Sequence, residues 1–155
     1  MRLLALTGAG AIALAGLVGS AAAQDADGAA IYKRCAACHL ATGAGVPGAF
    51  PPLRSDIRGF AMKPDGRRYL VLVVLKGVSG PIMAEGKPYR GVMPAQAGLN
   101  DAQIAAVLNH VLATSARGAP AAKPFSAAEV AQVRAGSAGV NAAAVGKLNG
   151  SLAGK

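Results

Sequence analysis

The protein has 155 residues, a length that suits one domain, and although 53% of them are hydrophobic only 4% are aromatic. Few large side chains are therefore available to fill a core, and the composition leaves room for a bulky bound group. Lys and Arg outnumber Asp and Glu by 16 to 7, which favours association with an acidic partner, whereas scattered basic residues without a binding motif argue against nucleic acid.

The N-terminal segment has the features of an export signal. Arg2 supplies a positive charge, residues 3–18 form an apolar run, and Ala21-Ala22-Ala23 offers a small-residue cleavage site. These features predict a signal peptide over residues 1–23, cleaved after Ala23, and hence a periplasmic protein. An uncleaved membrane anchor is the alternative, because residues 3–23 nearly suffice to span a bilayer.

The only two cysteines lie in the run Cys35-Ala36-Ala37-Cys38-His39. A C-x-x-C-H run is the signature of covalent haem attachment. On a helical turn, residues three apart share one face, so both thiols can reach the vinyl groups on one edge of a porphyrin, and His39 can supply a nitrogen to the iron. Asp27 is a capping-type residue that predicts a helix leading into the motif. The pattern predicts one covalent haem c.

Three other uses of these cysteines remain open from the pattern alone. Two nearby cysteines in an exported protein can form a disulfide, and C-x-x-C is also a thioredoxin-type redox motif, although no strand pattern precedes Cys35. A zinc site needs further ligands, and after Cys35, Cys38 and His39 only His110 remains.

The middle of the chain alternates between loop signals and one apolar run. Residues 39–60 are rich in Gly and Pro, which predicts a long ordered loop. Residues 66–76 are strongly hydrophobic, and their periodicity is compatible with either a buried strand or a helix. Their Val content favours the strand. Residues 77–91 return to turn chemistry.

A haem iron in an electron carrier needs a second axial ligand, and methionine is a common one. Beyond the predicted signal the chain has Met62, Met83 and Met93. Pro94 stiffens the loop that holds Met93, and the other two have no comparable support. A buried methionine is more often part of a core, so spacing alone leaves Met93 undecided between ligand and core.

The strongest helix signal follows Met93. Asn100 and Gln103 form a capping-box pattern, and apolar residues then recur at helical spacing, which predicts a helix over about 101–115. A Gly/Ala/Pro linker covers 117–124, and a shorter helix is predicted at about 126–135. The Gly/Ala-rich residues 137–155 have little to bury and are predicted to form a flexible tail.

Together these segments resemble class I cytochrome c over roughly residues 27–115. The order is C-x-x-C-H, Gly/Pro loop, hydrophobic helix, Met-Pro and amphipathic helix. In detail, four segments are similar to two kinds of domain. These segments are Phe50-Pro-Pro-Leu53, Val74-Leu-Lys-Gly77, Tyr89-x-Gly-Val-Met-Pro94 and the run from Leu99. The two kinds of domain are the haem domains of alcohol dehydrogenase cytochrome subunits and the small cytochrome partners of molybdenum-dependent dehydrogenases.

The resemblance implies a role for individual residues. His39 would be the proximal iron ligand and Met93 the distal one, and the carbonyl of Pro51 would accept a hydrogen bond from the far nitrogen of the His39 ring. Gly28 and Tyr32 would lie where the first helix crosses the helix of residues 101–115. His110 departs from the aromatic residue frequent in the family and is read as packing in that crossing.

The resemblance also implies an all-α fold, with three to five helices around one haem, long Gly/Pro loops, and a helix at residues 69–76. The predicted organisation is a signal peptide at 1–23, a cytochrome c domain at 24–116, and a C-terminal extension at 117–155.

The function implied is that of a periplasmic mono-haem carrier of single electrons between a dehydrogenase and a respiratory acceptor, without enzymatic activity or a small-molecule substrate. The alternative is a fixed electron-accepting subunit of a dehydrogenase complex, of the alcohol, sulfite or molybdenum-hydroxylase type. The expected partners are redox proteins with acidic docking surfaces, and membrane association is expected only through an uncleaved signal or a partner. The candidate docking residues are Lys33, Arg34, Lys87 and Arg90.

Overall fold

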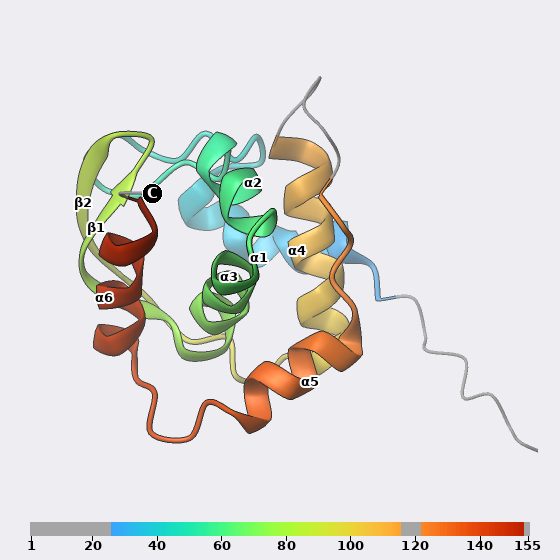
Figure 1. Ribbon diagram of the computed structural model, residues 1–155. Helices are drawn as coiled ribbons and strands as arrows, with labels where there is room; N and C mark the ends of the chain where they lie inside the picture. The colour runs from blue at the N-terminus through green and yellow to red at the C-terminus, as the bar shows by residue number, and fades with distance from the viewer. Residues whose placement is uncertain (1–25, 116–121, 154–155) are drawn as a thin grey trace, which may run out of the picture.

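The computed structural model describes residues 26–115 and 122–153, and the predicted signal peptide lies outside them. Within these ranges the chain forms six helices and a two-stranded sheet (Figure 1). The elements, in chain order, are α1 (Gly28–His39), α2 (Ser55–Ala61), α3 (Pro64–Lys76), β1 (Val78–Ala84), β2 (Lys87–Met93), α4 (Asp101–Ser115), α5 (Ala127–Ala135) and α6 (Ala142–Ala153). None of the described helices is long and apolar enough to cross a bilayer.

The predicted all-α class is confirmed, with two differences in detail. The described residues contain six helices rather than three to five, and a short hairpin accompanies them. Helix α3 runs through the middle of the molecule, with α4 on one side and the hairpin and α6 on the other (Figure 1).

Helix α1 begins and ends at residues suited to both positions. The Asp27 side chain accepts hydrogen bonds from Ala29 N and Ala30 N, which satisfies two of the free N–H groups of the first turn. The helix ends at His39, where Leu40 takes a positive φ of 62°. The C-x-x-C-H run therefore occupies the last two turns of α1.

Helices α1 and α4 cross at close range, as the resemblance implied. A Cβ at Gly28 would lie 2.2 Å from the carbonyl oxygen of Ala106. One turn later the ring of Tyr32 lies 5.2 Å from the ring of His110, and the Tyr32 hydroxyl donates to Leu40 O at 2.9 Å. The contact places His110 in the helix crossing, which is the packing role predicted for it.

Because of this close approach, Gly28→Ala should destabilise the folded protein by about 1–3 kcal/mol, the usual range for overpacking a tight contact. Gly59 is the matched control, since it lies within α2 and a Cβ there meets nothing within 4 Å. Gly59→Ala should leave stability unchanged or raise it slightly. Denaturant unfolding of both variants measures the difference, and equal stabilities would contradict the crossing geometry.

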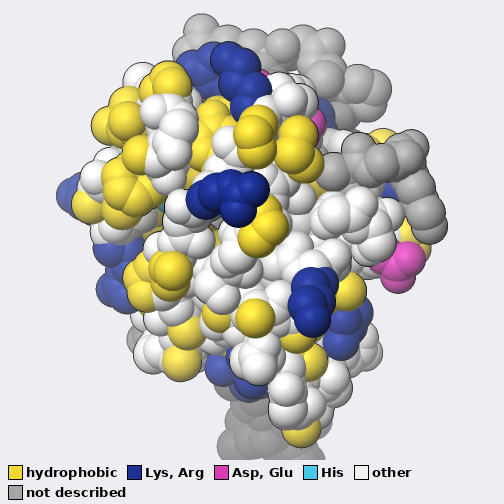
Figure 2. All heavy atoms as spheres, turned by 90° about the vertical axis from the view of Figure 1, so that its left-hand side faces the viewer, with side chains coloured by type: hydrophobic (Ala, Val, Ile, Leu, Met, Phe, Trp, Pro, Cys, Tyr) yellow, Lys and Arg dark blue, Asp and Glu magenta, His cyan; other side chains and the backbone are white. Residues whose placement is uncertain are grey.

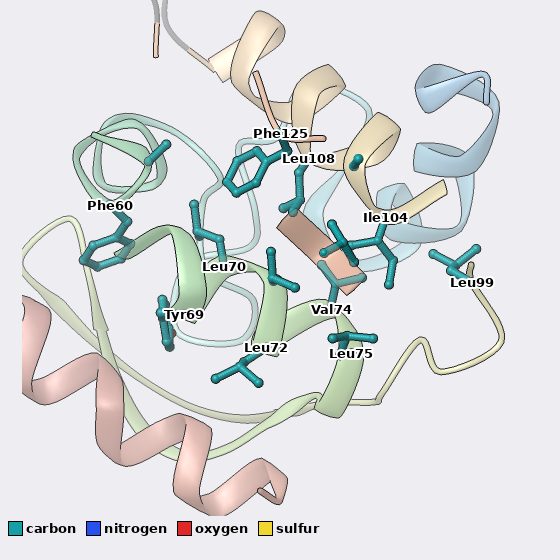
Figure 3. Close-up of a cluster of buried hydrophobic side chains, with 14 of the residues drawn as sticks. Phe60, Tyr69, Leu70, Leu72, Val74, Leu75, Leu99, Ile104, Leu108 and Phe125 are labelled. Carbon is teal, nitrogen blue, oxygen red and sulfur yellow. The ribbon is translucent and has the colours of Figure 1, made fainter. Parts of the chain in front are cut away.

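The Val-rich run that periodicity left undecided is helical, in agreement with the family resemblance. Helix α3 starts with Pro64 at its first turn, a position that needs no N–H donor. Val71 and Leu72 are fully buried, and Figure 3 shows α3 side chains packed against those of α4. A helix that is apolar on several faces is stable when neighbours cover it all round, and tertiary packing overrides the strand preference of valine.

Two predictions for the loops need correction. The Gly/Pro-rich stretch 39–60 includes the start of α2 at Ser55, and residues 77–91, expected as turns, largely form the β1–β2 hairpin. The carboxylate of Glu85, at the turn of the hairpin, accepts hydrogen bonds from the backbone N–H (2.8 Å) and the hydroxyl (2.7 Å) of Ser55. This contact attaches the hairpin to the first turn of α2. No local sequence pattern predicts it.

The predicted flexible tail is also wrong for the described residues. Helix α5 agrees with the predicted short helix, but residues 142–153 form a further helix, α6, which packs on β1. A Cβ at Gly146 would lie 2.2 Å from Ser79 O, so small residues let the helix approach the strand closely. Val145 is fully buried and Asn149 is 2% exposed. Although α6 has few large side chains, it is buried because its backbone lies close to β1.

One arginine fastens the C-terminal extension to α3. The Arg67 guanidinium makes two hydrogen bonds of 2.7 Å to the Glu129 carboxylate and lies 3.9 Å from the centre of the Phe125 ring. It also donates to the carbonyls of Lys123 and Pro124. Because Arg67 binds the charged form, the pKa of Glu129 lies below its ordinary value. This contact holds the start of α5 in place.

Candidate functional site

A largely apolar cavity opens between the end of α1, the loop after it, α3 and the hairpin. Its space, including the part open to solvent at the mouth, is about 890 Å³. Most of its lining is hydrophobic, from residues such as Leu70, Val73 and Ile82. Of the predicted site residues, the lining includes Cys38, His39, Pro51 and Met93.

The two cysteines lie one helical turn apart near the end of α1. Both are partly exposed free thiols. Cys38 lines the cavity, whereas Cys35 packs beside the small cluster formed by Tyr32, Val107 and Val111. Partial burial raises the pKa of the Cys35 thiol above its ordinary value. Cys38 therefore borders the cavity, and Cys35 lies one helical turn before it on α1.

His39 is buried and its ring is held in one orientation. Its Nδ1–H donates to the carbonyl oxygen of Pro51 at 2.8 Å, the contact that the resemblance implied. A carbonyl can only accept, so Nδ1 carries the proton and Nε2 is left with a lone pair. Burial lowers the pKa of His39, against the opposing effect of the Pro51 hydrogen bond, and so favours the neutral imidazole that a metal needs.

The loop after α1 brings Pro51 to this position by close backbone contacts. Gly45 N donates to His39 O at 3.0 Å, and Leu53 N donates to Gly43 O at 2.8 Å. Gly45 has a φ of +66°, and a Cβ there would lie 2.7 Å from Pro51 O. Only glycine tolerates both the positive φ and the lack of space for a Cβ. Gly45 therefore lets the loop bring the Pro51 carbonyl to the His39 ring.

The three methionine candidates are in different surroundings. Met93 is the last residue of β2, partly buried against the main core, and it lines the cavity. Met83 also lines the cavity but is 38% exposed. Met62 is 57% exposed and is not among the lining residues. The cavity therefore brings Met93 to the same space as His39, from a different element of the fold.

Two polar residues of the cavity were missed by sequence reasoning. Tyr69 of α3 and Asn149 of α6 both line it, and their side chains are hydrogen bonded to each other at 3.2 Å. Tyr69 was recognisable as the one hydroxyl-bearing residue in an apolar run. Asn149 carried no signal, because it lies in a stretch that was predicted to be a flexible tail.

The donor set and the lining fit a haem. An apolar cavity suits the faces of a porphyrin, Cys38 and its neighbour one turn earlier suit attachment at one edge, and His39 offers an oriented nitrogen. Within residues 26–115 and 122–153 there is no cluster of three or more His, Cys, Asp or Glu side chains arranged to hold a metal ion.

Comparisons with known proteins agree with this geometry. The family model described as cytochrome c matches residues 26–115, more than half of the chain. A cytochrome c-552 of Thermus thermophilus is 47% identical over 121 residues, which cover 77% of this chain and 82% of that protein. A second cytochrome c-552 from the same species is 48% identical over 112 residues, covering 71% of this chain and 86% of the relative. Both matches are longer than the family match.

Proposed function

Because the chain belongs to the cytochrome c family, whose members carry electrons on a covalently bound haem c, we propose that it is an exported electron shuttle. It is an electron-transfer protein and not itself an enzyme, and its partners are redox proteins. The proposed role is transfer of single electrons between a dehydrogenase and a respiratory acceptor in the periplasm. The observation that carries the proposal is the His39 ring, held in one orientation by Pro51 at the wall of an apolar cavity.

In the proposed attachment Cys35 and Cys38 would each hold the haem through a thioether bond, and His39 and Met93 would bind its iron. The haem supplies an iron that cycles between Fe(III) and Fe(II). The Pro51 carbonyl keeps the His39 ring in place and makes its free nitrogen more basic. His39 at the end of α1 and Met93 at the end of β2 would hold the iron from two separate elements of the fold.

The lining of the cavity favours the reduced state. Fe(III) carries one more positive charge than Fe(II), and an apolar environment disfavours the extra charge. Leu70, Val73 and Ile82 supply such an environment, and a methionine ligand acts in the same direction. We therefore expect a raised reduction potential, suited to a carrier that accepts electrons from a dehydrogenase.

The charge of the surface supports an acidic partner. Lys33, Arg34, Lys87 and Arg90 are all exposed, and Arg90 follows Tyr89, which lines the cavity. On the face formed by the hairpin and α6, Lys and Arg side chains stand among hydrophobic ones, while acidic side chains show only at the edges (Figure 2). Such a surface speeds encounter with an acidic protein at low salt.

Fractionation of the native host tests the proposal. The haem-bearing protein should be recovered from the periplasm, begin at Gln24, and elute alone at about 1 M salt, where the Debye length is only about 3 Å and charge pairing is screened. Co-elution with a dehydrogenase chain at that salt concentration would show a fixed subunit instead. An intact mass that includes residues 1–23 would show an uncleaved anchor.

A further inference from the structure

The cavity wall contains a polar pair contributed by two distant parts of the chain. Tyr69 lies on α3, and Asn149 lies on α6, beyond the residues that the family model matches. Both side chains are buried, with exposed fractions of 4% and 2%, and both line the cavity. Figure 3 shows Tyr69 on the same side of the core as Phe60, whose ring lies 5.4 Å away.

Backbone contacts determine the orientation of the Asn149 amide. Met83 N donates to Asn149 Oδ1 at 2.7 Å, and Asn149 Nδ2 donates to Met83 O at 3.2 Å. A backbone N–H can only donate, so the atom facing Met83 N must be the amide oxygen. The nitrogen is therefore the atom that faces the Tyr69 hydroxyl, 3.2 Å away, and it donates there.

This orientation determines what the Tyr69 hydroxyl can do. Its oxygen accepts from Asn149, so its own hydrogen must point elsewhere. The Tyr69 hydroxyl makes no other hydrogen bond to the described residues. Since Tyr69 lines the cavity and otherwise packs in the hydrophobic core, the cavity is the space left for that hydrogen.

We propose that Asn149 is a positioning residue that turns the Tyr69 hydroxyl toward the haem and thereby raises the reduction potential. The positive end of an O–H dipole disfavours the extra positive charge of Fe(III) in a site of low dielectric constant. The C-terminal helix thus adjusts the electron affinity of the cytochrome domain as well as covering it. The inference requires haem in the cavity, but it is independent of the partner proteins and of the distal ligand.

Potentiometric titration of haem-loaded variants tests the proposal. Tyr69→Phe should lower the equilibrium constant for reduction by roughly three- to tenfold, where tenfold corresponds to about 59 mV for one electron. Asn149→Leu should also lower the equilibrium constant for reduction. Val145→Ala is the matched control, because Val145 is fully buried on α6 and is not among the lining residues. It should loosen α6 and leave the potential unchanged.

The double variant separates positioning from general packing. If Asn149 acts through Tyr69, Asn149→Leu should have no further effect in the Tyr69→Phe background. Asn149→Ala, measured in parallel, gives the same comparison with a smaller side chain. The proposal is overturned by equal Asn149 effects with and without the hydroxyl, by a potential shift in Val145→Ala as large as that in Asn149→Leu, or by an unchanged potential in Tyr69→Phe.

Discussion

The double variant Cys35→Ala/Cys38→Ala should lose its covalent haem completely. These are the only two cysteines in the chain, so no other thiol can form a thioether bond. Each single variant keeps one sulfur and should retain haem through one bond, with Cys38 lining the cavity and Cys35 one turn away. The measurement is the intact mass of the denatured protein, made in a host with cytochrome maturation machinery.

The matched control for the cysteine variants is Ala37→Ser. Ala37 lies between the two cysteines and is exposed, so its substitution changes the motif without removing a sulfur, and a full haem mass is expected. Haem that stays attached after denaturation of the double variant would contradict the attachment. Wild-type protein that is colourless, with both thiols free, would instead support thiol–disulfide chemistry.

Met93→Leu should abolish the weak far-red absorption of thioether-bound Fe(III) and lower the reduction potential, while the haem remains covalently attached. The nature of the axial ligands sets haem potentials over a span of about 0.8 V, so we expect a fall on the order of 0.1 V or more. Leucine is close to methionine in volume and preserves the packing against the core. Visible spectra of the oxidised protein and a redox titration measure both effects.

Met83→Leu and Met62→Leu are the controls for this variant. Met83 lines the same cavity, so it tests whether the effect belongs to the cavity or to one sulfur. Met62 is largely exposed, and its substitution should change neither the spectrum nor the potential. Loss of the far-red band in Met83→Leu, with the band kept in Met93→Leu, would assign the distal ligand to Met83.

The amino-acid sequence by itself determined the features that depend on neighbouring residues. The C-x-x-C-H run places two thiols and an imidazole within two helical turns wherever that helix packs. The caps at Asp27 and at Asn100 with Gln103 are likewise local, since each side chain bonds backbone groups two or three residues away. Such features are visible in a sequence because the atoms concerned are never far apart.

Other features were decided by the tertiary structure alone. The apolar run of α3 is helical because other elements surround it, and the hairpin is anchored by Glu85 to Ser55, thirty residues away in the chain. Helix α6 exists where a flexible tail was predicted, because its small residues approach β1 closely and Asn149 finds partners in Met83 and Tyr69. These contacts join residues up to eighty positions apart. Local propensity carries no information about such distant partners, so only the folded chain could reveal them.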